Sequence, residues 1–264
     1  MKKFAAVFTL LLLLPLLLPA QTIKVEAMRP QFKFGDGEPS TFTSAWFVTV
    51  TVPVIKDGVS FIGQLPFAFG KLEDSKIPTK GETLGNPGFG LHFGGQNHAI
   101  EVMLRVPVVK YGFAGFIGSI ADFDRQEAFI PDLIPLTGKI KTKLSISKFS
   151  VQPYGGVSFN IKTEQKQNQF FRTVFNKLRE NDGELHVLYG ADGWFDFQPL
   201  YVGASFTGRG WVSSGGNFNE SVVNQAAVRA KLVFEKFSPG AYFRVPLDDL
   251  LLDNVIGLYF DVTL

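Results

Sequence analysis

Apolar and polar side chains alternate with a period of two along much of the chain. In one stretch, Ile100, Val102 and Leu104 alternate with Glu101 and Arg105. A period of two places successive side chains on opposite faces of a β-strand, whereas a helix needs a period of 3.6. The same alternation recurs at residues 46–54, 139–146, 151–161, 228–235 and 256–264. The pattern predicts an all-β protein.

About twelve strands are predicted from this alternation and from the turn residues between the alternating stretches. Several run about ten residues or more, the length that a tilted strand needs to cross a membrane, whereas ordinary strands average about five or six residues. An even number of strands is expected of an antiparallel transmembrane barrel. The predicted spans are 23–34, 43–55, 59–70, 88–94, 98–109, 139–147, 149–162, 184–197, 199–212, 222–236, 240–247 and 254–264.

The predicted connections alternate between short and long. The short ones are 56–58, 94–97, the residues around Lys148, 198–199 and 238–240. The long ones are 71–87, 110–138, 162–183 and 213–221. With both ends of the sheet in the periplasm, every long connection faces the outside, as expected of outer-membrane barrels with short periplasmic turns.

Alternation alone does not distinguish a membrane barrel from a soluble β-sandwich. In the sandwich the apolar side chains form the core and the polar ones face water, whereas in the barrel the apolar side chains face lipid and the polar ones face the lumen. No apolar stretch after Gln21 approaches the roughly 20 residues of a membrane-spanning helix. A membrane form must therefore be a closed barrel, which satisfies every backbone group in lipid. Strand length and loop alternation favour a closed antiparallel transmembrane β-barrel of about 12 strands over the sandwich.

The N-terminal residues 1–20 have the pattern of a secretory signal peptide. Lys2 and Lys3 precede an apolar run from Leu10 to Leu18, and Ala20 offers a small residue for cleavage. Residues 21–264 are then the barrel. The alternative, a membrane anchor helix, is disfavoured by the two prolines in this stretch and by the polar residues that begin at Gln21.

The last predicted strand resembles the C-terminal signal that the outer-membrane barrel-assembly machinery recognises. The resemblance rests on a glycine followed by apolar or aromatic residues up to the last position, here Gly257, Tyr259, Phe260, Val262 and Leu264. It departs from the usual form because the final residue is a leucine and not an aromatic residue. The resemblance implies outer-membrane lipid and the assembly machinery as partners.

Composition excludes several classes of protein. The chain has no cysteine, which excludes a disulfide scaffold and thiolate metal sites. Removing Lys2 and Lys3 with the signal peptide leaves 24 basic residues against 24 acidic residues. A formally neutral chain gives no electrostatic reason to expect a nucleic acid as a partner.

If the apolar set faces lipid, parity along each strand defines the side chains that face the lumen. Basic residues outnumber acidic ones in this set, which leads to the hypothesis of an open passage that favours anionic or polar solutes. The alternative is a packed interior in which the charges pair with one another, since twelve strands lie between small filled barrels and wide porins. The lumen candidates are Glu101, Arg105, Lys141, Lys143, His186, Asp192, Arg209, Arg229, Lys231, Glu235, Arg244 and Asp261.

Two long connections contain more apolar residues than solvated loops usually do. In residues 168–180, apolar side chains recur at helical spacing with basic residues among them, which predicts an amphipathic helix in an outer loop. It could cap the barrel rim, fold inward or lie on the membrane surface. Residues 113–131 mix Phe116, Ile117 and Ile120 with Asp122 and Arg125, and this segment is expected to fold into the lumen.

Two stretches resemble an outer-membrane barrel family that is linked to the degradation of aromatic compounds, the phenol meta-pathway type. The first is residues 64–70, a loop, and residues 84–93 with their Gly-x-Gly strand; the second is residues 101–109 with Leu104, Pro107 and the residues between. About a third of the chain is covered. The resemblance implies uptake of hydrophobic or aromatic solutes across the outer membrane, and it implies no catalytic residues.

An enzymatic barrel would need a nucleophile or an activated water beside a base, usually a histidine. The three histidines are His92, His98 and His186, and none is followed two residues on by a serine. No carboxylate–histidine spacing indicates a metal site, and no cofactor is expected. The sequence therefore favours a passive channel or transporter for small hydrophobic, aromatic or anionic solutes. The alternatives are a structural surface barrel with a plugged lumen and, less favoured, a lipid hydrolase.

Overall fold

The computed structural model describes residues 21–32, 41–56, 58–72, 80–95, 97–163, 183–212, 221–248 and 252–264. The predicted signal peptide at residues 1–20 and the predicted amphipathic helix at residues 168–180 lie outside the described residues. Most of the predicted connection 213–221 lies outside them as well.

The described part of the chain contains fourteen strand segments and two helical segments, joined by turns and irregular connections. The strands are β1 (Thr22–Phe32), β2 (Thr41–Ile55), β3 (Val59–Leu72), β4 (Lys80–Leu84), β5 (Gly88–Gly94), β6 (His98–Arg105), β7 (Leu133–Thr142), β8 (Leu144–Ile146), β9 (Phe149–Lys162), β10 (Gly183–Phe197), β11 (Leu200–Trp211), β12 (Val222–Leu232), β13 (Phe237–Pro246) and β14 (Leu252–Thr263). Helix α2 (Phe113–Ala121) and the 3-10 helix η2 (Phe123–Ala128) lie between β6 and β7. Within the described ranges, no helix is long and apolar enough to cross a membrane.

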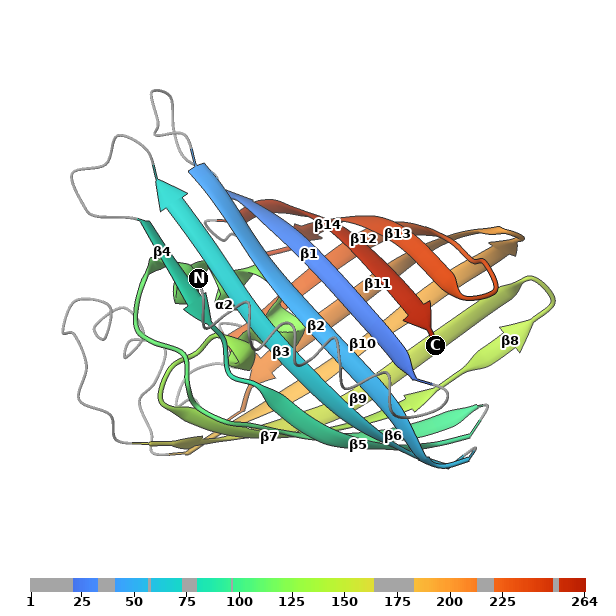
Figure 1. The fold of residues 1–264 in the computed structure, drawn as a ribbon, viewed down its shortest axis with the longest axis horizontal. Coiled ribbons are helices and arrows are strands. Elements are labelled where there is room, and N and C mark those ends of the chain that lie inside the picture. Colours follow the sequence, from blue (N-terminus) through green and yellow to red (C-terminus); the bar gives the residue numbers. More distant parts are fainter. Residues whose placement is uncertain are drawn as a thin grey trace.

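The strands form one closed antiparallel sheet, the barrel of Figure 1. β1 pairs with β14, from Thr22 opposite Thr263 to Gln31 opposite Asn254, and β9 pairs with β10. The fourteen segments occupy twelve positions, because β4 and β5 both pair with β3 and because β7 and β8 both pair with β9. The predicted twelve-strand closed barrel is confirmed.

Apolar side chains cover the outside of the barrel. Val102, Leu104 and Ile140 are 38%, 45% and 60% exposed, whereas Glu101 and Lys141, which alternate with them, form an ion pair inside the barrel. An apolar outer surface on a closed sheet suits a bilayer, since closure leaves no backbone edge unpaired in lipid. The protein is a transmembrane β-barrel, and the soluble sandwich is excluded.

Two predicted long connections contain strand. Within the predicted connection 71–87, β4 pairs with the end of β3 that lies away from the short turns, from Phe67 opposite Leu84 to Lys71 opposite Lys80. We call this end of the barrel outer and the end with the short turns inner. Within the predicted connection 110–138, residues from Leu133 onward already belong to β7. Neither piece has the length and alternation that a sequence pattern needs, because β4 has only five residues and β7 begins next to a turn.

The strand predicted at 98–109 ends earlier, at Arg105. Pro107 has no N–H to donate to a neighbouring strand. The N–H groups of Val108 and Val109 donate to the side-chain oxygen of Asn86 at 2.9 Å and 3.0 Å. An amide side chain therefore takes the place of a strand partner at this point of the wall.

Residues 113–131, which we call the plug, fold into the barrel and confirm the prediction for this segment. Figure 1 shows α2 inside the barrel, behind β2 and β3. Ala121, Phe123 and Phe129 pack in one core with Met28 of β1 and Phe47 of β2. Apolar residues of the plug thus turn the outer part of the lumen into a packed interior.

Two glycines allow the plug to pack closely. A Cβ at Gly118 of α2 would lie within 2.3–2.6 Å of the Phe129 ring, and a Cβ at Gly70 of β3 would lie 2.8 Å from the Phe113 ring. Both distances are shorter than any contact that a real Cβ makes. The Phe129 ring therefore fits against α2 because position 118 has no side chain, and the Phe113 ring fits against β3 because position 70 has none.

Candidate functional site: the vestibule and the plug that closes it

Beneath the plug, the barrel encloses a cavity of about 720 Å³, which we call the vestibule. Its lining includes inward side chains near the short turns, such as Thr51, Ser60 and Lys231, and plug residues such as Asp122 and Asp124. The vestibule is therefore the inner half of the lumen, and the plug forms its outer end. Its volume is in the range of ligand-binding cavities, roughly 300–1,000 Å³.

Most of the predicted lumen residues line this vestibule. The structure places along it Glu101, Arg105, Lys141, Asp192, Arg229, Lys231, Arg244 and Asp261. His186 and Arg209 also point inward, but they are buried against the plug, where the Arg209 Nε–H donates to His186 Nδ1 at 3.2 Å. Parity along the strands therefore identified the inner face correctly at these positions.

Two predicted lumen residues lie elsewhere. Lys143 sits in the break between β7 and β8, where it is exposed and its backbone N–H donates to the Asn97 carbonyl. The break interrupts the parity that had placed Lys143 with Lys139 and Lys141. Glu235 is exposed in the turn after β12. Parity fails at both positions because neither residue belongs to a strand.

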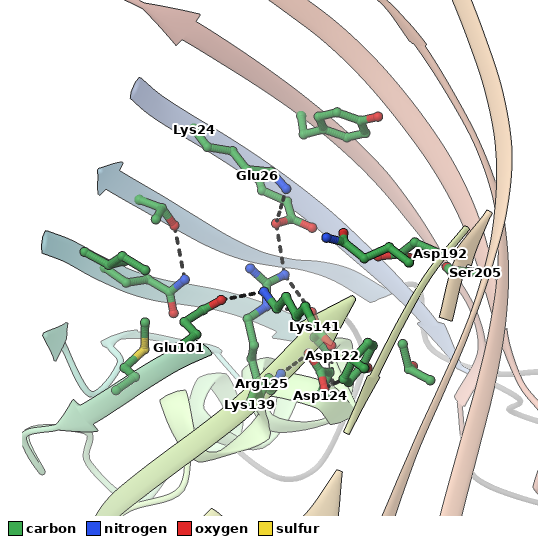
Figure 2. Close-up of a pocket in the computed structure, with 18 of the residues that line it drawn as sticks. Lys24, Glu26, Glu101, Asp122, Asp124, Arg125, Lys139, Lys141, Asp192 and Ser205 are labelled. Atoms are coloured by element: carbon green, nitrogen blue, oxygen red, sulfur yellow. Dashed lines mark hydrogen bonds and ion pairs between the residues drawn. The ribbon is translucent and has the colours of Figure 1, made fainter. Parts of the chain in front are cut away.

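Charged side chains of the vestibule pair between strands: Glu101 of β6 pairs with Lys141 of the neighbouring β7, and Asp192 of β10 pairs with Arg229 of β12, across β11. Lys141 Nζ lies 2.5 Å from Glu101 Oε2, and Arg229 Nη2 lies 2.5 Å from Asp192 Oδ1. Figure 2 shows Lys141 reaching toward Glu101 within the cavity. At these pairs the charges neutralise one another, as in the alternative to the open basic passage, but the pairs line a cavity and are not packed.

One ionic cluster joins the plug to the wall through Arg125. Its Nη2 lies 2.6 Å from Asp122 Oδ2 within the plug and 2.9 Å from Glu26 Oε2 on β1, and its guanidinium stacks 3.9 Å from the centre of the Phe47 ring. Arg244 of β13 adds a contact of 3.4 Å to Asp122 Oδ1. Figure 2 shows Arg125 between Glu26 and Asp122.

This cluster keeps both plug residues charged. Burial opposes ionisation of Asp122, but Arg244 and Arg125 outweigh it and hold the pKa of this carboxyl well below its usual range. Burial also opposes the charge of Arg125, but Glu26 and Asp122 raise the pKa of its guanidinium above the usual range. Asp122 and Arg125 are therefore both charged at neutral pH.

A second ionic contact joins the plug to β11. Arg209 Nη1 of β11 lies 2.6 Å from Glu127 Oε1 of η2, and both side chains are at least 96% buried. Burial raises the pKa of Glu127, but Arg209 outweighs this effect and the resulting pKa is about 2. Asp124 completes the attachment through Lys139 Nζ at 2.6 Å and through the Tyr154 hydroxyl at 3.1 Å.

Asn86, between β4 and β5, fastens the plug by its amide. It is fully buried, and its Nδ2 donates to the Glu127 and Ile130 carbonyls at 2.9 Å and 2.7 Å. Its Oδ1 accepts from the wall residues Val108 and Val109. Sequence reasoning missed this residue. The Gly-Asn-Pro-Gly stretch marks a break in strand pairing, but it does not say which partners the amide will find.

The three histidines considered for enzymatic roles lie in different surroundings. His92 lines the vestibule, and His98 Nδ1 lies 3.2 Å from the Thr142 hydroxyl on an exposed surface. His186 accepts from Arg209 and lies 3.5 Å from Glu184. Among the described residues, no cluster of three or more His, Asp or Glu side chains could hold a metal ion.

The C-terminal residues of the predicted assembly signal divide between the two faces of β14. Tyr259 lines the vestibule, whereas Phe260 and Leu264 are 41% and 53% exposed. A Cβ at Gly257 would lie 2.0 Å from the Tyr242 ring, whose hydroxyl donates to Glu26 at 2.9 Å. Gly257 therefore makes room for an inner-face ring in the finished barrel.

The barrel resembles solved outer-membrane barrels in fold. An outer-membrane channel from Pseudomonas putida F1 is similar with a TM-score of 0.61 at 11% identity, over 94% of this chain and 96% of that chain. The translocator domain of the autotransporter NalP from Neisseria meningitidis has a TM-score of 0.58 at 8% identity, over 92% and 88%. The β-domain of the Bordetella autotransporter BrkA has a TM-score of 0.54 at 9% identity, over 93% and 99%. No protein-family model and no curated protein matches the sequence.

Proposed function

We propose that this outer-membrane barrel is a passive channel for small solutes that the plug closes at rest. The observation that carries the proposal is the position of a cavity of about 720 Å³ directly beneath a plug held to the wall by side-chain contacts. A cavity that ends at a non-covalently held segment becomes a passage when that segment moves. The channel-like fold, shared with the barrel from Pseudomonas putida F1, supports the same function.

For the solutes, we propose small hydrophobic, aromatic or anionic molecules. The resemblance of residues 64–70, 84–93 and 101–109 to the phenol meta-pathway type supports hydrophobic and aromatic solutes. The vestibule adds aromatic rings to this argument, because Tyr154, Trp194 and Tyr259 line it beside its charged pairs. Swelling rates of proteoliposomes in a series of neutral, anionic and cationic aromatic solutes test this class.

Several accompanying features belong to the same proposal. Residues 1–20 direct export and are removed, and residues of β14 are recognised during assembly into the outer membrane. Lipid on the outer surface and a small solute in the lumen are the proposed partners. We propose that the protein acts without a catalytic step, and hydrolysis of a phospholipid by the purified barrel would contradict that part.

A disulfide between the plug and the wall tests the gate. A Cβ built on Gly81 of β4 lies 3.8 Å from the Cβ of Ala114 in α2, and disulfides join Cβ atoms about 3.8 Å apart. The chain has no cysteine of its own. The double variant Gly81→Cys, Ala114→Cys should therefore form one defined bond when it is oxidised, without competing thiols.

In planar bilayers, the oxidised double variant should lose the opening steps that the wild type shows, and a reducing agent should restore them. The two single-cysteine variants are matched controls, because neither can form the bond. Openings that persist unchanged in the oxidised protein would show that the plug is not the gate and would overturn the proposal.

The second candidate is a structural surface barrel whose lumen stays plugged. The number of wall strands that hold the plug favours this candidate, because the plug is contacted by side chains of β1, β7, β9, β11 and β13. A wild-type protein that shows no openings at any applied voltage, and no solute flux in liposomes, would support this candidate over the channel.

A further inference from the structure

Arg105, the last residue of β6, is an inward-facing and deeply buried charge. Arg105 is 5% exposed, and it lines the vestibule near the plug. Its Nη2 donates to Gln64 Oε1 at 2.5 Å, and its Nη1 donates to the Asn86 carbonyl at 3.2 Å. Both acceptors are neutral, so they satisfy N–H groups without compensating the charge.

Arg105 differs in this respect from the other arginines of the lumen. Arg125, Arg209, Arg229 and Arg244 each lie within 4 Å of a carboxylate oxygen. Among the described residues, no carboxylate lies within that distance of Arg105. Glu127, Asp122 and Asp124 act on Arg105 only from beyond ion-pair distance, so the cost of burying its charge is not offset by a direct ion pair. The position therefore retains an attraction for an anion that could approach the guanidinium directly.

The wall is built to leave room for this guanidinium. Gly88 of β5 lies opposite Arg105 in the sheet register, and a Cβ there would come within 3.1 Å of Arg105 Nη1 and 2.9 Å of Met103 Sδ. Any larger residue at position 88 would press on the guanidinium. The side chain of Arg105 thus lies over a bare stretch of backbone, held in place by Gln64 and Asn86.

We propose that Arg105 is the anion-binding group of the vestibule and that its ligand is the carboxylate of a small monoanionic solute. This rests on the proposed channel function and names the chemical class that the channel holds at the base of its plug. A guanidinium binds a carboxylate through two parallel hydrogen bonds in one plane. Arg105 donates two of its five N–H groups to the described residues, so donors remain for such a ligand.

The surroundings select one negative charge and an apolar body. Ile62 and Met103 line the same cavity as Arg105 and offer apolar contact. The plug residues Glu127, Asp122 and Asp124 contribute three negative charges to the field at Arg105, against one positive charge from Arg125, and this balance disfavours a dianion. A monocarboxylate with a compact hydrocarbon body fits both conditions.

Isothermal titration of the detergent-purified barrel with benzoate and with benzamide tests the proposal. The two probes have nearly the same shape, but only benzoate carries a charge. Wild-type protein should bind benzoate at least tenfold more tightly than benzamide. Equal affinities for the two probes, or tighter binding of inorganic phosphate than of benzoate, would overturn the assignment.

Arg105→Gln should lower benzoate affinity at least tenfold and leave benzamide affinity unchanged. Arg229→Gln is the matched control, because Arg229 lines the same vestibule but is paired with Asp192, and its benzoate affinity should change less than threefold. Equal losses in both variants would show a diffuse field in place of a site, which contradicts the proposal.

Two further variants cover the case in which Arg105→Gln does not fold, as judged by heat-modifiable migration. Arg105→Lys retains the charge but not the planar fork, and Gly88→Ala displaces the guanidinium without removing it. Each should weaken benzoate binding severalfold in a folded barrel, and wild-type affinity in both would refute the role of Arg105.

The same titration on the oxidised Gly81→Cys, Ala114→Cys protein separates this proposal from the gate. The vestibule extends toward the short turns, so benzoate should reach Arg105 while the plug is held. Binding without conductance in the oxidised protein, and conductance on reduction, supports both proposals. Conductance in the oxidised protein would contradict the gate but not the anion site. Failure of benzoate to bind to both the oxidised and the reduced protein would contradict the anion site but not the gate.

Discussion

The inner and outer halves of the lumen use the same kinds of residue in opposite ways. In the vestibule, pairs such as Lys141 with Glu101 line a space of about 720 Å³, and their side chains are 29% and 22% exposed. At the plug, Arg209 and Glu127 are 4% and 3% exposed and are surrounded by protein. Ion pairs of the first kind contribute little, whereas breaking one of the second kind leaves a buried charge. The comparison indicates that ion pairs hold the plug in place, whereas the ion pairs that line the vestibule contribute little to stability.

Removing the plug should have the largest effect on the difference between the two halves of the lumen. Replacing residues 113–131 with a short Gly/Ser connection converts the outer half of the lumen from packed interior to open space. We expect single-channel conductance to rise at least tenfold in planar bilayers, while heat-modifiable migration stays as in the wild type. A conductance that remains at the wild-type level would mean that another segment closes the lumen.

The next largest effect is expected from Arg209→Met. This change leaves the buried carboxylate of Glu127 without its partner, which costs about 3–5 kcal/mol of plug attachment. Open probability in bilayers should rise accordingly. The double variant Arg209→Met, Glu127→Leu is the control, because it removes both charges and should return the open probability toward the wild-type value. Equal behaviour of the single and double variants would contradict the role of the ion pair.

Acidification should release the same contact more gently. The pKa of Glu127 is about 2, below the ordinary value of 4.5, so ionised Glu127 stabilises the docked plug. This stabilisation is complete above about pH 4.5 and is lost as the pH falls toward 2. Open probability should stay constant from pH 7 to pH 5 and rise below pH 4.5. Glu127→Gln should remove most of this rise, and an unchanged rise in that variant would assign it to other groups.

The smallest effect is expected in the vestibule. Lys141→Met breaks the pair with Glu101, where water still reaches both side chains, so barrel stability should fall by about 1 kcal/mol or less. Urea unfolding in detergent measures this change. A loss as large as that of Arg209→Met would remove the distinction between the two halves of the lumen.

The barrel wall was predictable because its signal is local. A strand shows its inner and outer faces within a few residues, so the alternation around Glu101 and Arg105 was enough to place both inside. The same local rule failed at Lys143, because the break between β7 and β8 depends on how β9 pairs with each piece.

The attachment of the plug was not predictable in the same way. Glu127 and Arg209 are 82 residues apart in the chain, and Asn86 is 41 residues from Glu127. Such contacts leave no periodic pattern in the sequence. The apolar content of residues 113–131 indicated that the segment folds inward, but only the three-dimensional arrangement shows which wall residues hold it.

The pairing of β1 with β14 has a consequence for how the protein is made. Thr22 and Thr263 face each other in the finished sheet, so the closing seam joins strands from opposite ends of the polypeptide. Until β14 is in place, the nascent sheet carries two free edges, and free edges invite pairing with other chains. Contacts between such distant segments also form slowly. The time between synthesis of β1 and insertion of β14 is therefore the period in which this protein is most exposed to aggregation.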